Sequence, residues 1–135
     1  MYYKQVEKII RDAIGGHWIW FLAPPIYLSD GEYVEVSPDQ MKEDMKDFVP
    51  SRPYTKTKHD CDDQTFEELG HMTKKVRKAR GFAWSTAHAF CIFIWKGELW
   101  IYDRGNIGRY VDFVNWNPKT YKIRGWPRRN NLLLI

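Results

Sequence analysis

The run from Ala87 to Trp95, AHAFCIFIW, constrains the fold most strongly, because its apolar residues predict a strand that is buried on both faces. Lys96-Gly97 follows and has the length of a two-residue β-turn. The segment from Glu98 to Asp103 then predicts the second strand of an antiparallel hairpin. The chain is therefore expected to contain a sheet, and the turn fixes which residues of the two strands face each other.

The register of this hairpin brings two polar side chains together. Counting back from the turn, His88 faces Gly105 and Asp103 faces Phe90. Asp103 is thus the diagonal neighbour of His88 on the same face of the sheet. Such neighbours lie roughly 7–8 Å apart between backbones, within reach of His and Asp side chains. Gly105, opposite the histidine, leaves room for the imidazole ring.

The remaining elements are expected to be helices first and strands later. Apolar residues at helical spacing predict helices over residues 2–14, 37–48 and 60–79, the second with Ser37 as N-cap, Pro38 at its first position and Gln40 closing a capping box. Short strands are expected over residues 33–36, 110–114 and 120–125, and the apolar residues 132–135 are expected to enter a core or a subunit contact. The predicted fold class is α+β, with N-terminal helices packed on an antiparallel sheet.

The length of 135 residues fits a single domain, 1–135. The first residues mix charges into their apolar positions and do not read as a signal peptide. The most apolar stretch, residues 18–28, is broken by Pro24 and Pro25 and is too short to span a bilayer. These features predict a soluble cytoplasmic protein with no membrane span, whose two cysteines stay reduced.

Cys61 stands at the predicted start of a long helix, within the sequence His59-Asp60-Cys61-Asp62-Asp63. The free N–H groups and positive dipole of a helix N-terminus stabilise a thiolate. The same N–H groups can bind the oxyanion that forms when sulfur attacks a carbonyl carbon. The negative charges of Asp62 and Asp63 act against the thiolate. The position of Cys61 predicts a nucleophile.

A nucleophilic thiol needs a base, and the base needs an orienting group. His88, at the head of the hairpin, and Asp103, at its end, supply these groups in the predicted register. Each residue taken alone also fits a structural role, as a buried thiol, a strand-end histidine and a turn aspartate. Their order along the predicted elements favours a catalytic triad. Cys91 lies three positions from His88, on the opposite face of an apolar strand, and is predicted to be a core thiol.

This arrangement resembles the papain-like and transglutaminase-like superfamily of cysteine peptidases. It is most similar to the family of the C-terminal protease domain of the Marasmius agglutinin, which has small phage and bacterial relatives. The resemblance covers about residues 28–126 and is carried by Tyr54, Asp60, Cys61, Asp62, Asp63, His88, Ala89, Trp100 and Asp103.

The resemblance implies a papain-like fold and a thiol hydrolase, or an acyltransferase, that acts on amide bonds. Its catalytic residues would be Cys61, His88 and Asp103, its substrate a polypeptide, and Tyr54 on the preceding loop would donate to the oxyanion. No cofactor is required by the residues themselves. The resemblance implies that calcium is a possible requirement. Asp60, Asp62 and Asp63 offer oxygen ligands of the right kind, but three near-adjacent residues at a helix start cannot all face one ion.

The formal charge of +4 leaves a second interpretation open. Basic residues gather in two clusters, Lys74 to Arg80 and the segment from Arg104 to Arg129, and such surfaces attract acidic partners. An inactive homologue could use them to bind protein or, less favoured because no nucleic-acid motif is present, nucleic acid. A structural zinc site at His59 and Cys61 is disfavoured, because the chain has no CxxC or HxxxH spacing. The sequence does not indicate an oligomeric state.

Overall fold

The computed structural model describes residues 1–15, 23–53, 55, 61–73, 78–125, 128 and 130–135, and the side chains of residues 61, 62 and 73 lie outside this set. Within it, eleven elements follow one another along the chain: α1 (Tyr3–Ile14), β1 (Ile26–Leu28), α2 (Pro38–Met45), α3 (Cys61–Thr73), β2 (Arg80–Trp84), β3 (Ala89–Trp95), β4 (Glu98–Asp103), β5 (Asn106–Arg109), α4 (Tyr110–Trp116), α5 (Pro118–Tyr121) and β6 (Asn131–Leu134). The fold is mixed α+β, as the sequence predicts.

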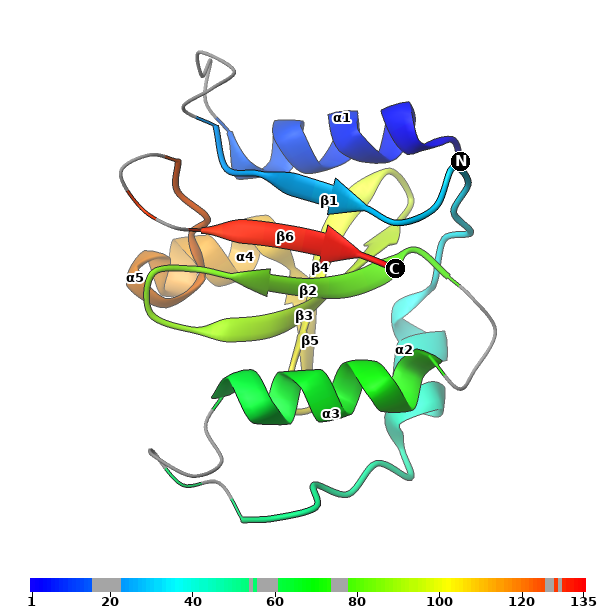
Figure 1. The fold of residues 1–135 in the computed structure, drawn as a ribbon, viewed down its shortest axis with the longest axis vertical. Helices are drawn as coiled ribbons and strands as arrows, with labels where there is room; N and C mark the ends of the chain where they lie inside the picture. Colours follow the sequence, from blue (N-terminus) through cyan, green and yellow to red (C-terminus); the bar gives the residue numbers. More distant parts are fainter. Residues whose placement is uncertain (16–22, 54, 56–60, 74–77, 126–127, 129) are drawn as a thin grey trace.

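The six strands form one sheet in the order β1-β6-β2-β3-β4-β5 (Figure 1). All neighbouring strands are antiparallel except β1 and β6, which are parallel. The expectation of a purely antiparallel sheet is therefore wrong at this pair. The apolar C-terminal residues enter the core as predicted, because β6 lies between β1 and β2 with Leu132 and Leu134 fully buried.

The two faces of the sheet have separate apolar cores. Alternate residues of β3 point to opposite faces, so Phe90 belongs to one core and Cys91 to the other. The helices α1, α4 and α5 cover the face of Phe90, and α2 and α3 cover the face of Cys91 (Figure 1). Cys91 is fully buried, which confirms it as a core thiol.

Local signals account for α1 and for the start of α2. In α1, Val6, Ile10 and Ile14 are spaced by four residues and are buried, and the helix ends at Gly15 with φ 74°. Ser37 caps α2 by accepting from the backbone N–H of Gln40, as predicted. The Gln40 side chain donates to Asp44 instead of closing a capping box, and α2 ends at Met45, before the expected boundary.

Four other predicted elements differ from the structure. The helix predicted over residues 60–79 corresponds to α3, which ends at Thr73. Residues 74–77 lie outside the described set, and β2 already begins at Arg80. The strand expected at 110–114 is the helix α4, and the strand expected at 120–125 begins in α5. Residues 33–36 form no strand, and near them a single bridge joins Tyr2 to Glu32.

No helix among the described residues is both long enough and apolar enough to cross a membrane.

Candidate active site

A tight turn between β2 and β3 holds the backbone of His88. The Ser85 N–H donates to the His88 carbonyl at 2.9 Å, and the Ser85 hydroxyl oxygen accepts from the His88 N–H at 3.1 Å. The Ser85 hydroxyl also donates to the carbonyl of Thr120, which ties the turn to α5. These bonds therefore hold the backbone of His88 independently of any contact that its ring makes.

The hairpin has the register that the sequence predicts. Trp95 pairs with Glu98 and Cys91 with Tyr102, so Asp103 ends β4 beside the head of β3. The imidazole Nε2 of His88 lies 2.9 Å from Oδ2 of Asp103. Both side chains are largely buried, with 13% of His88 and 10% of Asp103 exposed. The structure thus brings together two of the three residues predicted to act in catalysis.

Tyr121 is a third member of this group, and it was not predicted from the sequence. Its hydroxyl donates to Oδ2 of Asp103 at 2.6 Å, the same oxygen that contacts His88. Its ring meets the His88 ring edge to face at 5.8 Å. Burial raises the pKa of Tyr121, and the hydrogen bond to Asp103 and the charge of that carboxylate raise it further, so the phenol stays a donor. The residue comes from α5, which the sequence analysis assigns to a strand.

Cys61 is the first residue of α3, the position that the sequence predicts, and its side chain lies outside the described set. The placement of its backbone follows from the next helical turn, where the Thr65 hydroxyl donates to the Ala89 carbonyl at 3.2 Å. Further along, Glu68 approaches Cys91, so α3 and β3 run in the same direction (Figure 1). Position 61 lies four residues before Thr65, about 5.4–6 Å along the helix axis, toward the end of the sheet where His88 lies.

The two faces of the sheet restrict how a thiol at position 61 could meet the imidazole. The helix α3 packs on the face of Cys91, whereas His88 shares its ring contacts with Phe90 and Tyr121 on the other face. The sulfur and the imidazole can therefore meet only beyond the first residue of β3, where the strand no longer separates the two faces. Tyr54, predicted as an oxyanion donor, and His59 and Asp60 lie outside the described residues.

Glu68 is a second buried carboxyl group, and the charge of Asp103 acts on it. It belongs to α3, is 3% exposed, and its Oε2 lies 3.9 Å from the Cys91 sulfur. Burial, with the charge of Asp103 as a smaller cause, raises the pKa of Glu68 to about 7. Burial also raises the pKa of the Cys91 thiol, and the charges of Glu68 and Asp103 add to this, so Cys91 is inert as a nucleophile at neutral pH.

Glu68 makes the stability of the fold depend on pH. The folded protein holds this proton up to about pH 7, whereas an ordinary glutamate of pKa 4.5 releases it earlier, so the free energy of unfolding falls as pH rises between these values. The expected loss is about 3 kcal/mol. We expect Glu68→Gln to remove this slope, with a gain over wild type at pH 8 and little difference at pH 4.5, in urea unfolding at both pH values.

The matched control for this measurement is Glu67→Gln. Glu67 directly precedes Glu68 in α3, is less buried than Glu68, and contacts Ser51. Its replacement removes the same charge, and we expect the slope of stability with pH to stay as in wild type. A difference between wild type and Glu68→Gln that is the same at pH 4.5 and pH 8 would show that Glu68 does not titrate in this range.

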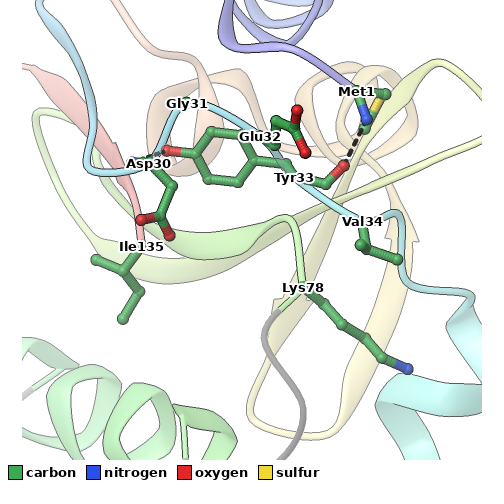
Figure 2. A pocket seen from close by; sticks show the side chains of 8 residues that line it. All are labelled: Met1, Asp30, Gly31, Glu32, Tyr33, Val34, Lys78 and Ile135. Carbon is green, nitrogen blue, oxygen red and sulfur yellow. Dashed lines mark hydrogen bonds between the residues drawn. The ribbon is translucent and has the colours of Figure 1, made fainter.

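A pocket of about 480 Å³ lies next to Tyr121, between β5, α4 and α5. The pair of His88 and Asp103 is called the dyad below. Its walls include the rings of Phe113, Trp116 and Tyr121. A second pocket, of about 420 Å³, lies at the other end of the sheet, where the Met1 amino group donates to the Tyr33 carbonyl and Ile135 follows the end of β6 (Figure 2). The first pocket is lined by Tyr121, whose hydroxyl donates to Asp103.

The basic surface is smaller than the sequence suggests. Arg80 does not belong to it, because its guanidinium is buried and donates to Asp44 at 2.7 Å. Arg109 pairs with Asp112 at 3.0 Å. Lys119, Arg124 and Arg128 are exposed. Among the residues that the structure describes, no three His, Cys, Asp or Glu side chains are grouped so as to hold a metal ion.

Comparison with protein-family models, with curated proteins and with solved structures finds no match for this chain.

Proposed function

We propose that this chain is a cysteine peptidase-like hydrolase that cleaves amide bonds through Cys61, His88 and Asp103, on a papain-like or transglutaminase-like fold. The observation that carries the proposal is the 2.9 Å contact between His88 and Asp103. This contact lies at the end of the sheet where the N-terminus of α3 is also found (Figure 1). An imidazole held by a carboxylate beside the start of a helix with a cysteine in first position has the parts that thiol catalysis requires.

In this proposal each ring nitrogen of His88 has its own role. Nε2 faces Asp103, so it carries the proton that this hydrogen bond needs, and Nδ1 remains to accept the proton of the Cys61 thiol. The thiolate then attacks the carbonyl carbon of the substrate, and the N–H groups at the start of α3 stabilise the oxyanion. The imidazolium returns its proton to the leaving amine as the C–N bond breaks, which leaves a thioester on Cys61.

The second half of the reaction regenerates the thiol. Water loses a proton to Nδ1 of His88 as it attacks the thioester, and the C–S bond breaks to give a carboxylic acid and free Cys61. An amine in place of water would make the same step an acyl transfer. Tyr121 is a positioning residue in this scheme, since its hydroxyl holds the oxygen of Asp103 that faces the imidazole. Tyr54 is proposed as a further donor to the oxyanion, and calcium as a requirement to be tested.

Alkylation of the native protein tests the proposal directly. Treatment with iodoacetamide between pH 5 and pH 9, followed by peptide mapping, gives the rate at each cysteine. We expect Cys61 to react fast, with a thiolate pKa well below about 8.5, because the helix terminus and imidazolium stabilise it. Cys91 should stay unmodified because it is fully buried.

The same preparation is then assayed for cleavage of a mixed peptide pool, with calcium and with a chelator. Turnover that is lost on alkylation of Cys61 supports the hydrolase. A Cys61 pKa above 8, or no cleavage in either condition while Cys61 is reduced, would contradict it and favour a binding module that uses the basic surface.

A further inference from the structure

The strand β5 is an edge strand of the sheet. The strand order places β5 at the end of the sheet, where it pairs with β4. Arg104 and Gly105 have φ values of 51° and 86°, typical of a two-residue hairpin turn of type I′. In such a hairpin the flanking residues Asp103 and Asn106 exchange both backbone hydrogen bonds. The pairs alternate along the ladder, so the N–H and C=O of Ile107 point outward, away from β4.

No described residue bonds to these outward groups of Ile107. An edge of this kind accepts an extended polypeptide as a further strand, because the peptide backbone supplies the complementary donors and acceptors. Asn106, Ile107 and Gly108 thus offer a short backbone track that begins opposite Asp103.

The pocket of about 480 Å³ lies along this same track. Asn106, Ile107 and Gly108 form one wall, and Phe113, Trp116 and Tyr121 form the apolar one. The rings of Phe113 and Tyr121 pack edge to face at 4.8 Å, while Trp116 is 74% exposed. A pocket with aromatic walls beside an unpaired strand fits an apolar side chain that projects from an extended peptide.

Tyr121 connects this pocket to the dyad, because its ring lines the pocket and its hydroxyl donates to Asp103. A peptide on the β5 edge would therefore lie next to the groups proposed for catalysis. Asp112 is the charged residue in the lining of this pocket, and it pairs with Arg109 at 3.0 Å. Their pairing leaves aromatic contact and backbone pairing as the features that select a ligand here.

We infer that a polypeptide substrate adds to β5 as a further strand and places an aromatic or aliphatic side chain between Phe113, Trp116 and Tyr121. This inference rests on the proposed function, since it names the substrate class and one specificity pocket of the same site.

Two variants test it with two acetylated decapeptides of serine and glycine, one with a central phenylalanine and one with glycine there. Trp116→Ala removes an exposed pocket wall, and we expect kcat/KM for the phenylalanine peptide to fall about tenfold, with a smaller loss for the glycine peptide. Ile107→Pro removes the outward N–H and keeps the ladder to β4, so both peptides should lose similar factors. The control is Val111→Ala, which changes an exposed residue of α4 outside this pocket.

A binding measurement separates this inference from the proposed function. The Cys61→Ser chain, alone and combined with each variant, is titrated with both peptides, and isothermal titration calorimetry gives the affinity in every case. Tighter binding of the phenylalanine peptide that is weakened by Ile107→Pro supports the inference even if the wild type cleaves nothing. Equal binding of both peptides, or binding that neither Ile107→Pro nor Trp116→Ala weakens, would overturn it even if the wild type is an active peptidase. A melting curve for each variant shows that the fold is retained.

Discussion

Replacing His88 with alanine is expected to lower kcat/KM for peptide hydrolysis on the order of 10⁴-fold or more, because it removes the proton acceptor for the Cys61 thiol. The fold should survive, since Ser85 binds the backbone of this turn and not the ring. Peptide hydrolysis and the melting temperature are measured on the same sample. The rate of alkylation at Cys61 should fall at neutral pH as well, because the thiol then lacks its imidazolium partner.

Two further variants, Asp103→Asn and Tyr121→Phe, are expected to lower kcat/KM less than His88→Ala. Oδ2 of Asp103 receives the bonds of both His88 and Tyr121, so an asparagine with its carbonyl oxygen at that place keeps both and loses the negative charge. Asp103→Asn should therefore fall between wild type and His88→Ala. Tyr121→Phe removes one of the two hydrogen bonds to Oδ2 and should lower kcat/KM by about threefold to tenfold. Full activity in His88→Ala would exclude the imidazole as the base.

Replacing Asp44 with alanine is expected to lower the free energy of unfolding by about 3–5 kcal/mol, because it leaves a buried guanidinium without its counter-ion. Arg80 is 3% exposed and bonds to Asp44 of α2 at 2.7 Å and to the Met72 carbonyl of α3 at 3.0 Å. Burial alone would raise the pKa of Asp44, but the hydrogen bonds from Arg80 and Gln40 and the charge of Arg80 outweigh it and hold that pKa below its usual range. Urea unfolding at pH 7 gives the value.

The double replacement Asp44→Leu with Arg80→Met is the control for this pair. It removes both charges and fills similar space, so its stability should lie near that of wild type. A loss equal to that of Asp44→Ala would mean that the packing of α2 against β2, and not the unpaired charge, accounts for the effect.

The hairpin was predictable because its signals are local. A two-residue turn determines register without reference to the rest of the chain, and that register suffices to place Asp103 beside His88. The start of α2 was predictable for the same reason, since Ser37 caps its own helix. The placement of Cys61 at the first position of a helix also followed from the sequence around it.

The strand expected at 110–114 shows how tertiary contacts override local preference. Tyr110, Val111, Phe113 and Val114 are aromatic or β-branched and favour a strand. In the structure Tyr110 is buried, and Phe113 and Val114, three and four positions later, pack against the same core. That spacing matches a helical turn, and it became visible only once α1 and the sheet supplied a surface to pack on.

The second strand escaped prediction because Gly81 resembles a helix terminator. The structure gives this glycine another role, since a Cβ atom there would overlap the backbone carbonyl of Leu133 in the neighbouring strand. Glycine lets β6 approach β2 at this point. Tyr121 escaped prediction for a related reason, because its bond to Asp103 joins residues 18 positions apart and no local pattern marks it.

The position of β6 within the sheet also sets an order of events during synthesis. On the ribosome, β1 emerges early, yet its partner in the sheet is residues 131–134, more than 100 positions later by the pairing of Ile26 with Leu132. Until those residues leave the exit tunnel, the nascent chain presents unpaired edges on both β1 and β2, and chaperones that bind exposed strands have a target there. Contacts so distant in sequence are also slow to form, because a long loop must close first. The β2–β3–β4–β5 meander can pair while it is being translated, and the N-terminal segment joins the sheet last.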